Sequence, residues 1–127
     1  MRMPELRRYK QALEDKYDEL SEAIRNREAI AVDRSADVID ELQSAVERER
    51  AIAELDRFSR VLQQVRAALA RIQAGTFGIC LRCDEPISPA RLRALPWAPF
   101  CIRCQEAADA EAAAEEASAP DRLLRAA

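Results

Sequence analysis

The chain has 127 residues, of which 49% are hydrophobic but only 5% aromatic, and its formal net charge is −3. This is about one domain of sequence, and it has few of the bulky side chains that fill a large core. The acidic balance argues against non-specific DNA binding, and no apolar run approaches the roughly 20 residues of a membrane span. Without a signal-peptide core at its start, the chain is expected in the cytoplasm, with no membrane partner.

The first predicted element is a long helix over residues 4 to 30. Apolar side chains recur there at alternating three- and four-residue steps, with Lys10 as a polar interruption. These side chains are Leu6, Leu13, Tyr17, Leu20 and Ile24. At 1.5 Å per residue the helix would be about 40 Å long, so it needs a partner to bury this stripe.

The partner is predicted to be a second, longer helix that ends before Gly75. Its apolar stripe has the same spacing and comprises Leu55, Phe58, Leu62, Val65, Leu69 and Ile72. Because few residues separate the stripes, we predict one antiparallel coiled-coil hairpin over 4–74, with its tip at 31–40, in a monomeric chain. An intermolecular coiled coil is the alternative. The charged run at 47–50 predicts a thinner, more mobile distal half.

Two carboxylates, Asp37 and Asp40, lie three residues apart in the predicted tip, a spacing that places both on one side of a helix. A plain structural role is the alternative. Asp37 would then cap the returning helix, and Asp40 would be favoured in its first turn by the helix dipole. The residues alone favour this structural role over a functional one.

Residues 75–104 hold both glycines, four of the six prolines and all four cysteines, a composition typical of turns. The cysteines form two C-x-x-C pairs separated by 17 residues, a spacing found in zinc ribbons. They are Cys80, Cys83, Cys101 and Cys104. We predict one structural zinc ion with four thiolate ligands, since a full shell leaves no position for an activated water. A redox dithiol is the alternative, but it would need a βαβ scaffold.

Other residues of this region are expected to support the module. Ser88 and Pro89 begin a short helix that Pro96 ends. Arg82 and Arg103, one inside each C-x-x-C pair, either help to neutralise the thiolates or are ordinary solvated surface. A C-terminal helix is expected over 105–119, followed by a disordered tail over 120–127.

The sequence contains no histidine and no glycine-rich phosphate loop, so an enzyme is not expected. The segment GTFGICLRCDEPISPARLRALPWAPFCIRC, with DVID ahead of it, resembles the DksA/TraR family of zinc-finger transcription factors. Members of that family bind bacterial RNA polymerase and insert a coiled coil into its secondary channel. They alter initiation without binding a specific DNA sequence. The resemblance implies that Asp37 and Asp40 are the functional tip pair, which reverses the interpretation from the residues alone.

The sequence departs from the family pattern in three places. Leu42 stands where the family's D-x-x-D-x-A tip has alanine, and the extended amino-terminal segment of longer members is not seen. Longer members also help to bind guanosine tetraphosphate (ppGpp) through basic side chains, at positions that match Gln64, Leu95 and Gln105 here. These three side chains are uncharged, and each charged contact with such a ligand contributes about 1.5–3 kcal/mol. We therefore expect little or no direct ppGpp response.

Two other functions stay open. One is a zinc-stabilised coiled-coil adaptor that binds a different protein. The other is a transcript-cleavage factor that uses the same channel and an acidic tip to hold a catalytic Mg ion. A cleavage factor is the less favoured of the two, because the zinc module resembles the other family.

Overall fold

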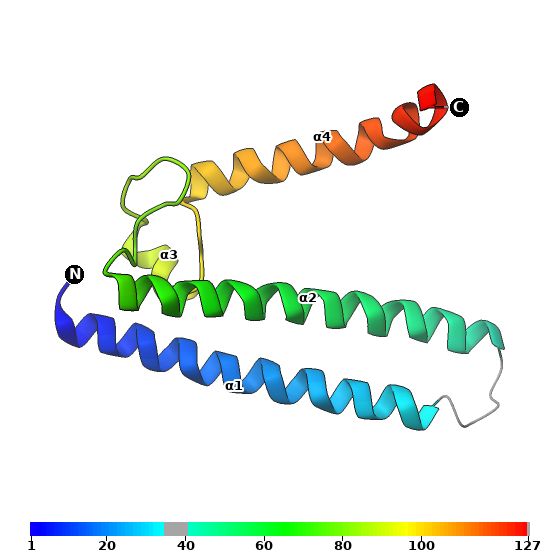
Figure 1. The fold of residues 1–127 in the computed structure, drawn as a ribbon, viewed down its shortest axis with the longest axis horizontal. Helices are drawn as coiled ribbons and strands as arrows, with labels where there is room; N and C mark the ends of the chain where they lie inside the picture. The colour runs from blue at the N-terminus through cyan, green and yellow to red at the C-terminus, as the bar shows by residue number, and fades with distance from the viewer. Residues whose placement is uncertain (35–40, 127) are drawn as a thin grey trace. The chain divides into compact units, whose positions relative to one another are not determined.

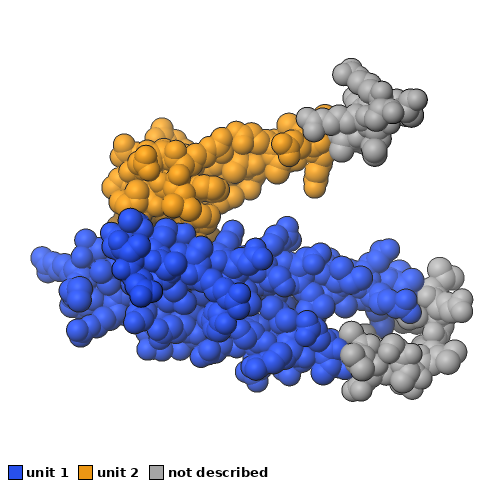
Figure 2. Space-filling model, in the orientation of Figure 1, with its two compact units in different colours: residues 1–77 blue, residues 78–127 orange. Residues whose placement is uncertain are grey.

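A computed structural model describes residues 1–34 and 41–126, with side chains described for residues 1–29 and 45–118. Its four helices are α1 (Met3–Arg34), α2 (Glu41–Ala74), α3 (Pro89–Ala94) and α4 (Ile102–Ala126), as Figure 1 shows. The predicted mainly helical fold is therefore confirmed. The chain divides into two compact units, residues 1–77 and residues 78–127 (Figure 2).

The first unit is a helical hairpin in which α1 and α2 lie side by side and antiparallel (Figure 1). Among its described side chains, the buried apolar ones are Leu13, Leu20, Val65, Ala68 and Phe77. The ring of Phe77, just beyond α2, lies 5.3 Å from that of Tyr9 near the start of α1. The hairpin thus buries part of the predicted apolar stripe of each helix, as amphipathic helices of this length require.

Both helices of the hairpin extend to the predicted tip. α1 continues to Arg34, into the segment that the sequence predicts as the tip, and α2 begins at Glu41. At 1.5 Å per residue the two helices are about 48 and 51 Å long. The predicted tip residues Asp37 and Asp40 lie outside the described residues, as does the side chain of Leu42.

Polar and aromatic side chains also connect the two helices. A group that we call the Phe58 cluster consists of Arg27 on α1 and Glu54, Arg57 and Phe58 on α2. Arg27 forms a salt bridge with Glu54, and its guanidinium lies 5.2 Å from the centre of the Phe58 ring. Arg57 lies 5.7 Å from that ring centre, with its Nη2 3.9 Å from a Glu54 oxygen.

A second contact of this kind lies nearer the base of the hairpin. Arg66 on α2 donates a hydrogen bond of 3.2 Å to the Tyr17 hydroxyl on α1, and its guanidinium lies 5.4 Å from the ring centre. This hydrogen bond, together with the Arg66 charge, lowers the pKa of Tyr17. Each helix therefore contributes one arginine that meets an aromatic ring of the other.

The end of α2 follows the predicted glycine stop. Gly75 has φ +79°, its N–H bonds to the Ile72 carbonyl (3.2 Å), and the Thr76 N–H bonds to the Arg71 carbonyl (2.9 Å). These two bonds form a Schellman motif, in which a residue in the left-handed region lets the last carbonyls of a helix find partners. Glycine adopts that region without the steric cost that a Cβ atom brings.

Replacing Gly75 with alanine tests this explanation. Nothing lies within 4 Å of the position where the new Cβ would stand, so the cost comes from backbone strain alone. We expect the variant to lose about 1–2 kcal/mol in free energy of unfolding of the hairpin, measured by urea denaturation. Thr76→Ala, next to it but without such a constraint, is the control. Equal losses in both variants would contradict the explanation.

The second unit contains α3 and α4. The Ser88 side chain caps α3 by accepting a hydrogen bond from the Arg91 N–H (3.3 Å), and Pro89 occupies the first turn, as predicted. α4 extends from Ile102 to Ala126 and is longer at both ends than the helix predicted over 105–119. Within the ranges that the structure describes, no helix is both long and apolar enough to cross a membrane.

Candidate metal centre

The first C-x-x-C pair lies in a tight hairpin-like turn. The Cys80 N–H bonds to the Glu85 carbonyl and the Ile87 N–H to the Gly78 carbonyl, both at 2.8 Å. Between them the Asp84 N–H bonds back to the Cys80 carbonyl at 3.0 Å. Asp84 has φ +61°, in the left-handed region that aspartate tolerates better than most residues. This fold-back places both sulfurs of the pair on the same side of the turn.

The second C-x-x-C pair lies at the start of α4. The Gln105 N–H bonds to the Cys101 carbonyl at 2.9 Å, so Cys104 is held in the first helical turn. Two bonds fix the chain just before it. The Leu81 N–H donates to the Pro99 carbonyl at 3.0 Å, and Arg91 Nε donates to the Phe100 carbonyl at 2.9 Å. The first bond connects the two cysteine turns directly, and the second connects α3 to the second turn.

These contacts bring the four sulfurs together. All four Sγ atoms lie within 4.8 Å of one another, and Cys83 Sγ is 3.9 Å from Cys101 Sγ. A tetrahedral zinc ion with Zn–S bonds of about 2.3 Å requires sulfurs about 3.8 Å apart. The spacing fits this requirement, and it is too wide for an S–S bond of about 2.05 Å. The donor set is therefore suited to one ion held by four thiolates.

The surroundings of the sulfurs shift their ionisation in different directions. Burial of the Cys80 thiol opposes ionisation, but the backbone N–H groups of Cys101, Cys83 and Arg82 outweigh it and lower the pKa of Cys80 to about 6. A hydrogen bond with the Cys101 thiol, together with burial, raises the pKa of Cys104 to about 12. Because metal ligands are thiolates, binding at neutral pH must displace protons, and metal affinity rises with pH.

The two arginines of the C-x-x-C pairs differ in their contacts. Arg82 Nη2 lies 2.5 Å from a Glu111 oxygen on α4, and this carboxylate raises the pKa of Arg82 most, with smaller contributions from Cys104 and Cys80. Arg103 is exposed. The first arginine therefore links the cysteine turn to α4. Glu111 cannot be selected from the glutamates of the C-terminal segment by sequence alone.

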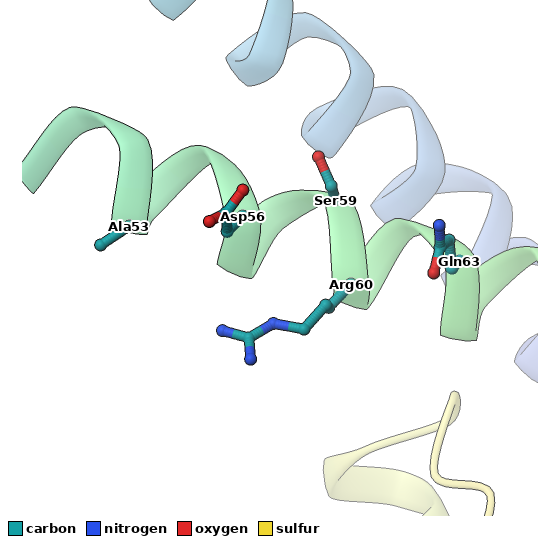
Figure 3. Close-up of a pocket in the computed structure, with 5 residues that line it drawn as sticks. All are labelled: Ala53, Asp56, Ser59, Arg60 and Gln63. Atoms are coloured by element: carbon teal, nitrogen blue, oxygen red, sulfur yellow. The ribbon is translucent and has the colours of Figure 1, made fainter. Parts of the chain in front are cut away.

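The hairpin carries a separate surface hollow of about 420 Å³. Its lining consists of Ala53, Asp56, Ser59, Arg60 and Gln63, all on α2 (Figure 3). All five side chains are exposed, and they include one acid and one base that could neutralise each other. The hollow has neither the enclosure nor the convergent polar groups of a ligand site.

A helical hairpin followed in the chain by a module of four clustered cysteines defines a class of structural zinc protein. The profile of the prokaryotic dksA/traR C4-type zinc finger matches residues 75–110. Across most of its length the chain resembles the solution structure of the DnaK suppressor protein from Agrobacterium tumefaciens C58. The identity is 32%, the coverage 80% of this chain and 91% of that one, and the TM-score 0.56. The chain belongs to the DksA/TraR family.

Three other proteins are similar to the chain in sequence or in fold. A protein from Aquifex aeolicus is 43% identical over 61 residues, which cover 45% of this chain and 42% of the relative. The RNA polymerase-binding transcription factor DksA of Caulobacter vibrioides is 34% identical over 71 residues, covering 56% and 50%. The chain thus spans about half the length of these curated relatives. Transcription factor DksA2 from Pseudomonas aeruginosa has the same fold, with a TM-score of 0.72 at 24% identity, covering 87% and 88%.

With the family and the sulfur geometry in agreement, the predicted cofactor is confirmed. The site holds one zinc ion through the thiolates of Cys80, Cys83, Cys101 and Cys104. These four ligands fill a tetrahedral shell, so the zinc ion stabilises the fold of the module and has no open position for a substrate.

Proposed function

We propose that this chain is a transcription regulator that binds bacterial RNA polymerase and modulates initiation. Its hairpin would enter the secondary channel, bringing Asp37 and Asp40 near the active centre. Membership of the DksA/TraR family is the observation that carries this proposal. The relative from Caulobacter vibrioides is named as an RNA polymerase-binding transcription factor, which supports the same partner here.

The dimensions of the hairpin support this mode of binding. Helices of about 50 Å can carry a chemical group deep into a partner while the rest of the protein stays outside. A polymerase active centre is organised around Mg ions and phosphates, and a pair of carboxylates brought near it would change the local electrostatics. The expected effect is a change in the stability of promoter complexes.

The zinc module has a supporting role in this proposal. Its closed four-thiolate shell offers no activated water, and neither histidine nor a phosphate loop is present in the sequence. We therefore propose no catalytic reaction for the chain. DNA sequence recognition is not part of the proposal either, since the formal net charge of −3 does not favour binding to DNA.

The proposed regulator would respond weakly to ppGpp. At the three positions where longer family members carry cations, this chain has neutral side chains. Gln64 and Leu95 are exposed, and Gln105 donates a hydrogen bond of 3.0 Å to Asp109. A highly charged phosphate ligand would gain no charge-assisted contact from any of them. A polymerase-dependent ppGpp affinity equal to that of longer members would contradict this part of the proposal.

Neutralising the tip carboxylates tests the function directly. We expect the double variant Asp37→Asn with Asp40→Asn to bind core polymerase within about twofold of wild type, because the helices that carry the tip are unchanged. Its effect on transcription in vitro should fall to background, since the charges near the active centre are lost. Binding is measured by co-purification with core polymerase, and the effect by run-off transcription.

A matched pair elsewhere on the hairpin is the control. Asp15 and Asp18 are also three residues apart, and both are exposed on α1. Asp15→Asn with Asp18→Asn should retain full activity. If core polymerase does not retain the wild-type chain at all, the proposal fails and an adaptor for another protein becomes the better description. Stimulated cleavage of transcripts in backtracked complexes would indicate a cleavage factor instead.

A further inference from the structure

Apolar packing in the hairpin is concentrated near its base. Among the described side chains, the buried ones reach only as far as Leu20 on α1 and Val65 on α2. Nearer the tip, among side chains 21–29 and 45–64, none is buried, and the apolar ones that face the seam, such as Ile24 and Leu55, are only half-buried. Interdigitated apolar side chains normally hold two helices in one register, so this half of the hairpin needs another source of register.

The Phe58 cluster lies in this half and has contacts that depend on the register. Arg27 meets a carboxylate at Glu54 and a ring at Phe58, one helical turn apart on α2. Sliding α1 by one turn toward the tip would place Arg27 opposite another cation, Arg50, and the Glu54 carboxylate. Sliding it toward the base would give it the Phe58 ring and Leu62, with no carboxylate. Both slips lose the combined salt bridge and ring contact.

The contact between Tyr17 and Arg66 is consistent with the same register. From Tyr17 to Arg27 the chain advances ten residues along α1, and from Arg66 to Phe58 it returns eight residues along α2. Two antiparallel helices with equal rise should show nearly equal steps, and these differ by two residues, about 3 Å of rise, which is less than one turn. The two arginine–aromatic contacts are therefore compatible with a single alignment of the helices.

This alignment sets where each helix ends relative to the other. α1 ends at Arg34, seven residues beyond Arg27, and seven residues from Phe58 toward the tip is Ala51. The Tyr17–Arg66 contact gives Glu49 by the same count, so about the first two turns of α2, roughly 12 Å of helix, extend beyond the end of α1. Figure 1 shows the end of α2 projecting past that of α1. Burial agrees with this, because side chains 45–50 are all exposed and Ala51 is half-buried.

We propose that the Phe58 cluster positions the tip, because it sets the hairpin register and so fixes how far α2 projects beyond α1. A polar contact in an otherwise apolar helix seam can specify register at some cost in stability. A slip of one turn would move the projecting end by about 5.4 Å. The inference rests on the proposed function only where it gives this projection a role in reaching the polymerase active centre.

The test replaces the charged pair with apolar side chains, Arg27→Leu with Glu54→Leu. We expect helix content and thermal stability to be retained or raised, because two leucines pack well in a helix seam. The distance between two spin labels is measured in the free, zinc-loaded protein by pulsed electron paramagnetic resonance. The labels are attached to genetically encoded amino acids that carry a ketone, at positions 26 and 48, so that the four cysteines stay unmodified. These two sites are offset along the hairpin, so the distance between the labels depends on the register. Loss of register should broaden the distance distribution, and a slip of one turn should shift its maximum.

Two further proteins make the result specific. Asp56→Leu with Arg60→Leu makes the same chemical change within the exposed hollow of α2, where Arg60 extends away from α1 (Figure 3), and should keep the wild-type distance. The charge swap Arg27→Glu with Glu54→Arg should give a narrower distribution than Arg27→Glu alone, because the salt bridge is restored. This second comparison gives an answer even if the leucine variant does not fold.

A wild-type distance in the leucine variant would overturn the inference, and so would a charge swap no narrower than Arg27→Glu alone. Because the distances are measured without polymerase, they do not depend on the proposed function. If register is lost but core polymerase never binds the wild-type chain, only the proposed function fails. If the inference and the proposed function both hold, the leucine variant should bind polymerase, but its effect on transcription should be reduced more than about fivefold. The Asp56 and Arg60 variant should keep its full effect.

Discussion

Removal of zinc is expected to unfold residues 78–104 while α1 and α2 stay helical. The module has few buried apolar side chains. Besides Cys80, they include Ile87, Leu92 and Ala98. At about 1.5–3 kcal/mol for a large buried side chain, they cannot offset an ordering cost of about 1–2 kcal/mol for each backbone residue. Zinc binding, at about 10–16 kcal/mol in small zinc modules, supplies the difference.

The single tryptophan provides the measurement for this prediction. Trp97 is half-buried within the module, so its fluorescence should shift to longer wavelength when a chelator removes zinc. The circular dichroism signal at 222 nm should keep most of its magnitude, because α1 and α2 supply most of the helix. Cys80→Ser should give the chelated spectrum at every zinc concentration, and adding zinc to the chelated wild type should restore the original one. An unchanged Trp97 spectrum after complete zinc loss would contradict the prediction.

The metal site could be predicted from the sequence because its chemistry is local. Two C-x-x-C pairs without any histidine leave thiolates as the only zinc ligands of the usual kind, and Ser88 with Pro89 marks the start of α3. Gly75 could be predicted as the end of α2 for the same reason, since the left-handed conformation there favours glycine. Each of these features depends on residues that are close together in the sequence.

Contacts between distant residues could not be predicted in this way. The apolar repeat shows that Phe58 faces a partner helix, but it does not show which residue of α1 lies opposite. Nothing in the sequence distinguishes Arg27 from the other arginines of the hairpin, although it contacts both Glu54 and Phe58. Pairing between helices depends on their register, and a periodic stripe fits several registers almost equally well. The link from Arg82 to Glu111 was missed because α4 contains several glutamates with similar surroundings in the sequence.

Among truncations to alanine in the two predicted apolar stripes of the hairpin, we expect Leu13→Ala to be the most destabilising. Leu13 is completely buried, at 0% exposure, in the half where apolar packing is densest. Leucine-to-alanine changes at such sites cost about 2–5 kcal/mol, because they combine lost apolar transfer with the cavity left behind. We expect a loss in this range in the free energy of unfolding, measured by urea denaturation at 222 nm in zinc-containing buffer.

Leu55→Ala deletes the same atoms at a half-buried position on α2 and is the matched control. It should cost about half as much, since part of its side chain is in water already and solvent can fill the space that it leaves. A zinc-loaded module should keep its Trp97 spectrum in both variants before unfolding, because neither residue belongs to the second unit. Equal losses for Leu13 and Leu55 would mean that packing is uniform along the hairpin. Apolar contacts would then be strong enough to hold the distal register, and the Phe58 cluster would not be needed for it.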